Sequence, residues 1–271
     1  MHGTAFFNDS LVEYSDLKLH ISDIGIQRGY AIFDYFKMKD GKIRFGEDYF
    51  DRFYNSAELA DLDVPMKRDA LASVINEIIE KNSSPTSYIK LLLTGGYSED
   101  GFNYDKSNFV ILNHEYTPQD PAHYENGINL ISAFYQRSSP EIKTTNYFMS
   151  AALHKKRKQY QAMDVLYHLD GIVTETSRAN FFVVRDDEIF TTEDDVLHGV
   201  TRKNFIEKVD KHYMVNTQNV WLEDIWDADA VFITSTTKGV MPVVRIDDSI
   251  IGNGKVSDQM RDIMDIFNPL L

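Results

Sequence analysis

The sequence predicts a protein built from two α+β domains. Strand patterns and helix patterns are interspersed along all 271 residues, a length that can hold one large domain or two of ordinary size. A polar segment with two prolines, residues 114–121, separates the two halves and is the best linker candidate. We therefore expect an N-terminal domain at 1–115, a linker at 116–125 and a C-terminal domain at 126–271.

The N-terminal half is expected to start with β-structure and to continue with two helices. Within it, Asp40-Gly41 follows an alternating strand pattern and predicts a two-residue hairpin turn. Apolar residues at i, i+3, i+4 and i+7 predict helices over 47–61 and 69–82. Residues 1–45 are expected to be β-structure, and further strands are expected at 88–94 and at 108–112. The glycine-rich loop 95–102 joins the last two strands and is expected to be mobile or functional.

The C-terminal half alternates short apolar runs, bounded by turn residues, with helical patterns. Strands are expected at 128–135, 165–169, 172–175, 180–184, 189–191, 231–234 and 240–246. Helices are expected at 147–161, 199–212 and 256–267. This mixture again indicates an α+β domain.

Composition excludes several classes of protein. The net charge of −14 argues against a nucleic-acid partner or an anionic membrane surface, because both require a basic footprint. The chain has no cysteine, so disulfides and thiolate metal sites are excluded, and no metal site is expected. Residues 1–10 lack the basic region and apolar run of a signal peptide, and no apolar run approaches the ~20 residues of a membrane span. The expected location is the cytoplasm.

Two motifs carry the chemistry. Lys143 follows a Ser-Ser-Pro-Glu turn and precedes a helical pattern, and Glu175 follows the Asp170-Gly171 turn and a short apolar strand. The segments 142–147 and 171–182 resemble the core signature of the fold-type IV pyridoxal-phosphate enzymes. These are the branched-chain aminotransferases, the D-amino-acid aminotransferases and aminodeoxychorismate lyase. The resemblance covers nearly the whole chain and implies a two-domain fold like that of D-amino-acid aminotransferase, with pyridoxal 5'-phosphate between the domains.

The resemblance gives three residues roles at the cofactor ring. Lys143 matches the Schiff-base lysine, whose amine must be neutral to react and so must be desolvated or held near positive charge. Glu175 matches the carboxylate that keeps the pyridine nitrogen protonated, which makes the ring a strong electron sink. Tyr147 matches a tyrosine that bonds the phenolic oxygen of the cofactor in the branched-chain enzymes.

The phosphate site implied by the resemblance is assembled from three distant pieces. Arg52 matches the phosphate arginine, which suits bidentate contact. Val200 and Thr201 match residues whose amides meet the phosphate at a helix N-terminus, where free N–H groups favour an anion. Thr236 matches the third piece, and Leu197 is expected to pack on the ring face.

The chain departs from the family pattern at positions that we expect to face the substrate. Asp34 replaces a glutamate, Gly95 an arginine, and Gly239 another glutamate. Substrate contacts are expected at Phe33, Thr237 and Lys238, with the amides of the last two near the substrate carboxylate. The cofactor is therefore predicted more firmly than the substrate.

Several functions remain open at this point. The first is an aminotransferase that exchanges an amino group between a small, branched-chain-like amino acid and a 2-oxoacid such as 2-oxoglutarate or pyruvate. Aminodeoxychorismate lyase, D-amino-acid aminotransferase, a cofactor-binding protein without catalysis and a cofactor-free binding module are the alternatives. The resemblance also implies a homodimer in which a loop of the partner covers the site, and residues 95–102 are the candidate substrate-lining loop.

Overall fold

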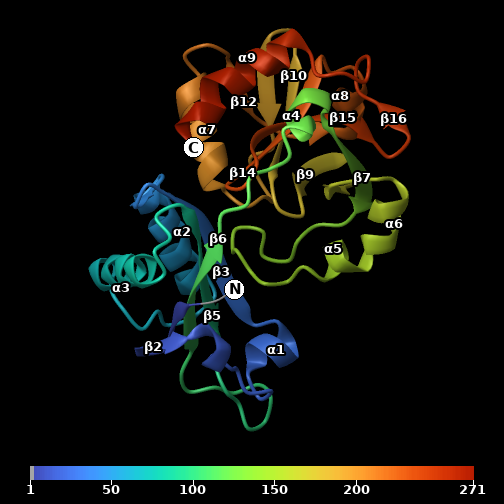
Figure 1. Cartoon of the computed structure of the whole chain (residues 1–271). Coiled ribbons are helices and arrows are strands. Elements are labelled where there is room, and N and C mark those ends of the chain that lie inside the picture. Colours follow the sequence, from blue (N-terminus) through green and yellow to red (C-terminus); the bar gives the residue numbers. More distant parts are fainter. Residues whose placement is uncertain (1–2) are drawn as a thin grey trace. The chain divides into compact units, whose positions relative to one another are not determined.

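The computed structural model describes residues 3–271, which form two compact units (Figure 1). Unit 1 holds the chain up to Thr117 together with the short segment Ile142–Asn146. Unit 2 holds Pro118–Glu141 and Tyr147–Leu271. The segment that carries Lys143 therefore belongs to unit 1, although its neighbours in sequence belong to unit 2.

Unit 1 contains a six-stranded sheet with the order β2-β1-β6-β5-β3-β4. Its strands are β1 (Thr4–Phe7), β2 (Ser10–Glu13), β3 (Ala31–Lys39), β4 (Lys42–Ile43), β5 (Ser87–Thr94) and β6 (Asn108–Glu115). The predicted hairpin is confirmed between β3 and β4, where Asp40 and Gly41 have φ of 52° and 72°. Positive φ at both central residues is what a tight turn between twisted strands requires.

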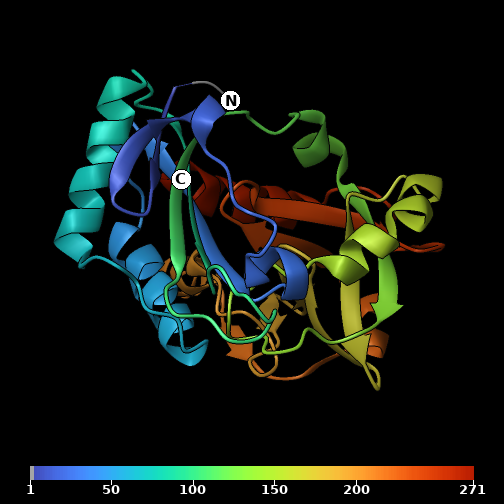
Figure 2. The same ribbon diagram turned by 90° about the horizontal axis from the view of Figure 1, so that it is seen from below.

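The helices of unit 1 are α1 (Ile24–Arg28), α2 (Gly46–Leu59) and α3 (Arg68–Lys81), with the 3-10 turn η1 at Tyr14–Asp16. Helices α2 and α3 lie on one side of the sheet, and α1 lies apart from them, next to the loop that follows β5 (Figures 1 and 2). Helix α2 packs against β3, and α3 packs against β1 and β6, over a core that includes the fully buried Phe36, Phe53 and Phe109. The expectation of β-structure throughout residues 1–45 is wrong at α1, because Asp23 caps this helix by accepting a hydrogen bond from the Gly25 N–H.

Unit 2 contains a larger sheet with the order β12-β11-β10-β14-β15-β7-β8-β9-β13. Its strands are β7 (Ile128–Phe134), β8 (Asp164–Leu169), β9 (Ile172–Thr176), β10 (Asn180–Arg185), β11 (Glu188–Thr191), β12 (Val215–Thr217), β13 (Val220–Trp221), β14 (Ala230–Ser235), β15 (Gly239–Ile246) and β16 (Ser249–Ile250). Strand β9 pairs with both β8 and β10, and this second pairing closes the strands from β10 round to β9 into a ring.

Both faces of the unit 2 sheet are buried. Along β10, Phe181 and Val183 point into one apolar cluster, and Phe182 and Val184 point into another. The second cluster is completed by α7 (Val200–Val209) and α9 (Asp258–Phe267). A strand that is covered on both sides reads as a continuous apolar run, which is why residues 180–184 were recognisable in the sequence.

The single helix expected over 147–161 is wrong. Two short helices, α5 (Phe148–Ala152) and α6 (His154–Gln159), meet instead at Leu153, whose ψ of 7° is not helical. Met149 before this break and Tyr160 after it both pack on the cluster of Ile131, Val165 and Tyr167. The break therefore gives both helices a contact with the same cluster.

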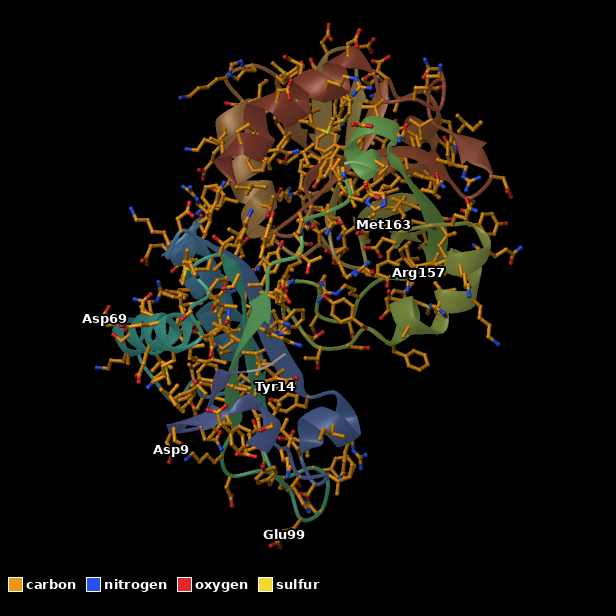
Figure 3. All side chains as sticks on the ribbon, viewed as in Figure 1. Asp9, Tyr14, Asp69, Glu99, Arg157 and Met163 are labelled. Carbon is orange, nitrogen blue, oxygen red and sulfur yellow. The ribbon has the colours of Figure 1, made fainter. Side chains whose placement is uncertain are left out.

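The remaining short elements of unit 2 are α4 (Ala122–Asn126), α8 (Leu222–Trp226) and η2 (Asn268–Leu270). Helix α4 begins inside the stretch that we expected to be a linker. In the described part of the chain, no helix combines the length and the apolar character needed to cross a membrane. Acidic side chains such as Asp9, Asp69 and Glu99 are exposed on unit 1 (Figure 3).

Candidate active site

Lys143 is held against the start of β3 in unit 1. The Lys143 carbonyl accepts a hydrogen bond from the Phe33 N–H (2.9 Å), and the Lys143 N–H donates to Ser56 Oγ (3.3 Å). The next residue, Thr144, forms an isolated β-bridge with Ile32. The Lys143 ammonium lies 4.9 Å from the centroid of the Phe33 ring. Two of the predicted site residues, Lys143 and Phe33, are therefore brought together.

Arg52 is oriented by a buried carboxylate. From α2, Arg52 donates from Nε to Asp34 Oδ2 (2.9 Å) and from Nη2 to Asp34 Oδ1 (2.7 Å). Asp34 is fully buried on β3, and both of its carboxylate oxygens are engaged by Arg52. A two-pronged contact of this kind fixes the plane of the guanidinium, and Asp34 therefore positions Arg52.

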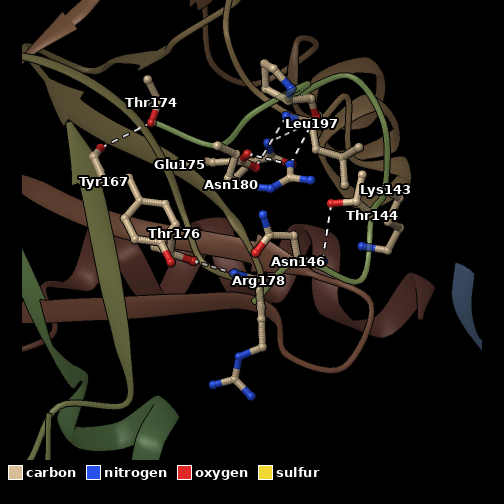
Figure 4. A network of polar contacts seen from close by, with 12 residues as sticks. Lys143, Thr144, Asn146, Tyr167, Thr174, Glu175, Thr176, Arg178, Asn180 and Leu197 are labelled. Atoms are coloured by element: carbon tan, nitrogen blue, oxygen red, sulfur yellow. Dashed lines mark hydrogen bonds and ion pairs between the residues drawn. The ribbon is translucent and has the colours of Figure 1, made fainter. Parts of the chain in front are cut away.

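Glu175 lies at the end of β9 with its carboxylate held from two sides. Arg137 donates from Nη1 to Glu175 Oε1 (2.9 Å), and the Leu197 N–H donates to Oε2 (3.3 Å), as Figure 4 shows for Leu197. The Glu175 side chain is only 6% exposed, so it needs the cation and the donor to offset the loss of water. The carboxylate is thus held by a cation on one oxygen and by a backbone donor on the other.

Asn180 joins the pieces of the unit 2 site. It is paired with Glu175 of β9 and with Thr234 of β14, and its side-chain amide donates to the Leu197 carbonyl (2.7 Å; Figure 4). A Cβ added to Gly199 would overlap Asn180 Oδ1, so this position requires glycine. Asn180 therefore lies next to Glu175, Leu197 and the start of α7.

The N-terminus of α7 has the character of an anion site. Val200 and Thr201 are its first residues and are buried, and the first N–H groups of a helix have no partner inside the helix. Nearby on β14, the hydroxyls of Thr234 and Ser235 are buried without a hydrogen-bond partner among the described residues. Orphaned donors beside a helix N-terminus fit the phosphate of a cofactor, and Thr236 follows directly in the chain.

The turn between β14 and β15 is held in place by Asn268, which lies near the C-terminus. The Lys238 N–H donates to the Ser235 carbonyl (3.2 Å), so this amide is engaged within the turn. Gly239 has φ of 60°, and a Cβ here would overlap Asn268 Oδ1. The same oxygen accepts a hydrogen bond from the Val240 N–H (2.8 Å). The glycine that replaces the glutamate of the family pattern makes room for this clamp.

Tyr147 immediately precedes α5 in unit 2. Burial raises the pKa of its phenol to about 12; Glu175 and Asp164 act in the same direction, and Arg137 and Arg178 oppose it. The phenol therefore keeps its proton at neutral pH and can donate a hydrogen bond.

The loop after β5 leaves no room for the arginine of the family pattern. A Cβ at Gly95 would collide with Ile24 and Tyr30. The loop is organised by Asp100, which accepts hydrogen bonds from the Phe102 and Asn103 amides, both 2.8 Å long. It borders a cavity of about 790 Å³ within unit 1, lined by His20, Ser22, Tyr97, Ser98, Glu99, Asp100, Asn103, Tyr104 and Asp105.

The predicted residues thus form one set on each unit. Unit 1 carries Phe33, Arg52 and Lys143, and unit 2 carries Tyr147, Glu175, Leu197, Val200, Thr201, Thr236, Thr237 and Lys238. Sequence reasoning missed Arg137, Asn180 and Asn268 as members of the site. Asn180 lies inside the recognised motif and could have been found there. Arg137 and Asn268 meet partners 38 and 28 residues away and leave no local pattern.

The chain is similar in sequence and structure to known aminotransferases. Residues 31–246 match the family model described as "Amino-transferase class IV". The chain is 26% identical to a Methanocaldococcus jannaschii protein provisionally named a branched-chain-amino-acid aminotransferase, over 98% of this chain and 95% of that one. It is also 26% identical to a D-alanine aminotransferase of Listeria innocua, over 92% and 89% of the two chains. The branched-chain amino acid aminotransferase of Escherichia coli has a similar structure, with a TM-score of 0.90, 22% identity and coverage of 98% and 93%.

Proposed function

Because the chain belongs to the class IV aminotransferases, we propose that it transfers an amino group between a small, branched-chain-like amino acid and a 2-oxoacid, with pyridoxal 5'-phosphate as cofactor. The observation that carries the proposal is the grouping around Asn180. It brings a buried carboxylate, Glu175, next to a helix N-terminus lined by orphaned hydroxyls. A protonated ring nitrogen and a phosphate are the two groups that such a site complements.

Each residue of the chain has a defined task in this proposal. When bound, the cofactor supplies an electron-withdrawing ring. Glu175, held by Arg137, faces the ring nitrogen, and Tyr147 donates to the phenolic oxygen. Lys143 would hold the cofactor through Nζ, and its amine, when free, would move the proton of the substrate α-carbon. Leu197 packs on the ring. The phosphate is held by Arg52, Val200, Thr201 and Thr236.

These tasks require that the two sets of residues serve one cofactor. In this proposal Phe33, Thr237 and Lys238 lie toward the substrate. The ring of Phe33 suits an aliphatic side chain, since it offers apolar surface close to Lys143. We also propose a homodimer, as in the family resemblance, with the 95–102 loop near the substrate.

A direct assay tests the proposal. The purified protein with pyridoxal 5'-phosphate is mixed with single L- and D-amino acids and either 2-oxoglutarate or pyruvate, and formation of the new oxoacid is measured. Wild type is expected to act on a small aliphatic amino acid, and Lys143→Ala is expected to be inactive. Lys255→Ala is the matched control, because this lysine is exposed and is not one of the proposed site residues.

Two other outcomes would replace the proposal. Release of pyruvate and 4-aminobenzoate from aminodeoxychorismate, with no acceptor added, would identify a lyase. Cofactor absorbance that no amino acid perturbs, together with no oxoacid product, would identify a binding protein without catalysis. Activity with D-amino acids alone would support the proposed type of reaction but show the opposite stereospecificity for the substrate.

A further inference from the structure

A second lysine, Lys90 of β5, lies close to the amine of Lys143. The Lys90 ammonium is 5.4 Å from the centroid of the Phe33 ring, and the Lys143 ammonium is 4.9 Å from the same centroid. In the antiparallel register of β3 and β5 the partner of Lys90 is Tyr35, two residues after Phe33, so Phe33 and Lys90 are diagonal neighbours on one face of the sheet. Because Phe33, Lys90 and Lys143 all belong to unit 1, this arrangement is independent of unit 2.

The two ammoniums are close enough for the charge of one to act on the other. Two atoms that lie 4.9 and 5.4 Å from one point are no more than about 10 Å apart, which is about the Debye length at physiological salt. Burial lowers the pKa of Lys90, so water screens this ammonium less than it screens an exposed one. The charge of Lys90 also acts on His114 of β6, whose pKa is lowered first by burial and then by Lys90.

Unit 1 places cations, and no free carboxylate, around the Lys143 amine. The segment 142–146 has no other charged residue. Side chains of β3, β5 and β6 alternate between two faces, and none of the Asp or Glu residues of these strands falls on the face of Lys90. Asp34 points to the opposite face, where Arg52 binds both of its carboxylate oxygens. On α2, Arg52 lies one turn before Ser56, the residue that accepts the Lys143 N–H.

An amine reacts with an aldehyde only in its neutral form, because the protonated form has no free electron pair. An unperturbed lysine side chain is neutral in only about one molecule in a few thousand at pH 7. A neighbouring cation disfavours the protonated form. A unit charge about 10 Å away, in a medium of effective dielectric constant ~20–40 and at physiological salt, increases the neutral fraction roughly 3- to 10-fold.

We propose that Lys90 is a second functional lysine of this chain: its charge beside the Phe33 ring disfavours protonation of the Lys143 amine and so enlarges the fraction that can react with an aldehyde. The sequence predicts that this amine needs burial or a nearby positive charge, and Lys90 supplies the charge. The inference rests on the proposed function only for the identity of the aldehyde, which is that of the cofactor. Lys90 acts through Lys143, so it is a positioning residue and needs no contact with cofactor or substrate.

Competitive labelling of the cofactor-free protein tests the inference. Trace acetic anhydride acylates neutral amines, and mass spectrometry of the peptide that contains Lys143 gives the labelling rate across the pH range in which lysine titrates. Lys90→Met is expected to lower labelling of Lys143 at pH 7 roughly 3- to 10-fold. Lys90→Arg keeps the charge and is expected to label like wild type. Lys37→Met is the matched control, because Lys37 lies on the same sheet face but packs on the Tyr116 ring (4.6 Å).

A second readout uses the cofactor. The rate at which added pyridoxal 5'-phosphate binds covalently at pH 7, followed by absorbance, is expected to fall in Lys90→Met by the same factor as the labelling rate. Raising the pH is expected to restore this rate, because the Lys143 amine is then neutral with or without a neighbouring charge.

The pH dependence separates a charge effect from a structural one. At a pH high enough to deprotonate lysine, Lys90→Met and wild type are expected to label Lys143 equally. A deficit that persists at that pH, or an equal deficit in Lys90→Arg, would overturn the inference. If labelling changes as expected but wild type acts on no amino acid, the proposed function fails and the charge effect stands. If wild type is active and Lys90→Met labels like it at every pH, the inference fails and the proposed function stands.

Discussion

At the scale of single residues, the site depends on charges that are buried in pairs. Arg137 and Glu175 have side chains that are 12% and 6% exposed, whereas the Arg185–Asp224 pair is 38% and 31% exposed. The contact distances are similar, 2.9 and 3.0 Å, so burial is the main difference between the two pairs. Water screens the charges of the exposed Arg185–Asp224 pair. The buried Arg137–Glu175 pair has little such screening, so each of its charges depends on the other.

Arg137→Ala is therefore expected to destabilise the protein by about 3 kcal/mol, because it leaves the buried Glu175 carboxylate without its cation. Arg185→Ala, the matched control, is expected to cost less than about 1 kcal/mol. Urea denaturation of the cofactor-free protein measures both. The double variant Arg137→Ala with Glu175→Gln should regain part of the loss. Equal effects of the two single variants would show that the buried pair has no special role.

Lys238 gives a prediction that depends on pH. Burial lowers the pKa of Lys238 from 10.5 to about 8, so between these values the unfolded chain binds more protons and stability rises with pH. Below pH 8 the buried charge costs up to about 3 kcal/mol, which Lys238→Met removes. This variant is expected to be more stable than wild type at pH 7 and to lose the advantage by pH 10.5. Urea denaturation at both pH values measures the difference in free energy of unfolding between the variant and wild type. A difference that does not depend on pH would be evidence against a buried charge.

At the scale of elements, the order of helices and strands was largely predictable. The apolar periods over α2, α3 and α9 and the Asp40-Gly41 turn are local signals, and local signals survive in a sequence. Helix α1 was missed because its five residues are stabilised by the Asp23 cap and by Gly29 in the left-handed region, not by an apolar face. The break at Leu153 was missed because contacts with β7 and β8, distant in sequence, decide it.

The residues of the candidate site also divide into those that a local motif identifies and those that it does not. Lys143, Glu175 and the threonines could be named because each lies in a short motif. The tasks of Arg137, Asp34 and Asn268 could not, because each is defined by a partner in another element. The family resemblance named the residues for the cofactor, and the structure adds the residues that hold them in place.

The start of α7 offers a test at this scale. Gly199→Ala would place a methyl group onto Asn180 Oδ1 and push the first turn of α7 away from β10. Cofactor affinity is expected to fall at least tenfold, since the helix N–H groups would no longer point at the phosphate. Fluorescence titration with pyridoxal 5'-phosphate measures it. Gly46→Ala, at the start of α2, has a looser surrounding and should bind the cofactor like wild type; unchanged affinity in Gly199→Ala would exclude this anion site.

At the scale of the whole molecule, the predicted site residues are divided between the two units. The chain leaves unit 1 after Thr117, returns with Ile142–Asn146 to deliver Lys143, and leaves again at Tyr147. This return puts the amine of Lys143 in the same unit as Phe33 and Arg52. Tyr147, the first residue after the segment, is in the same unit as Glu175. A single cofactor that needs both sets would explain why so short a segment changes units.

That explanation predicts one cofactor per chain whose affinity depends on residues of both units. Arg52→Gln in unit 1, made together with Asp34→Asn so that no carboxylate is stranded, and Thr201→Val in unit 2 are each expected to weaken pyridoxal 5'-phosphate binding roughly 10- to 100-fold. Arg68→Gln, an exposed arginine of α3 that pairs with Asp51, is the control and should have no effect. Calorimetric titration gives both stoichiometry and affinity. If the two units held separate anions, the titration would show two sites, and each variant would remove only one of them.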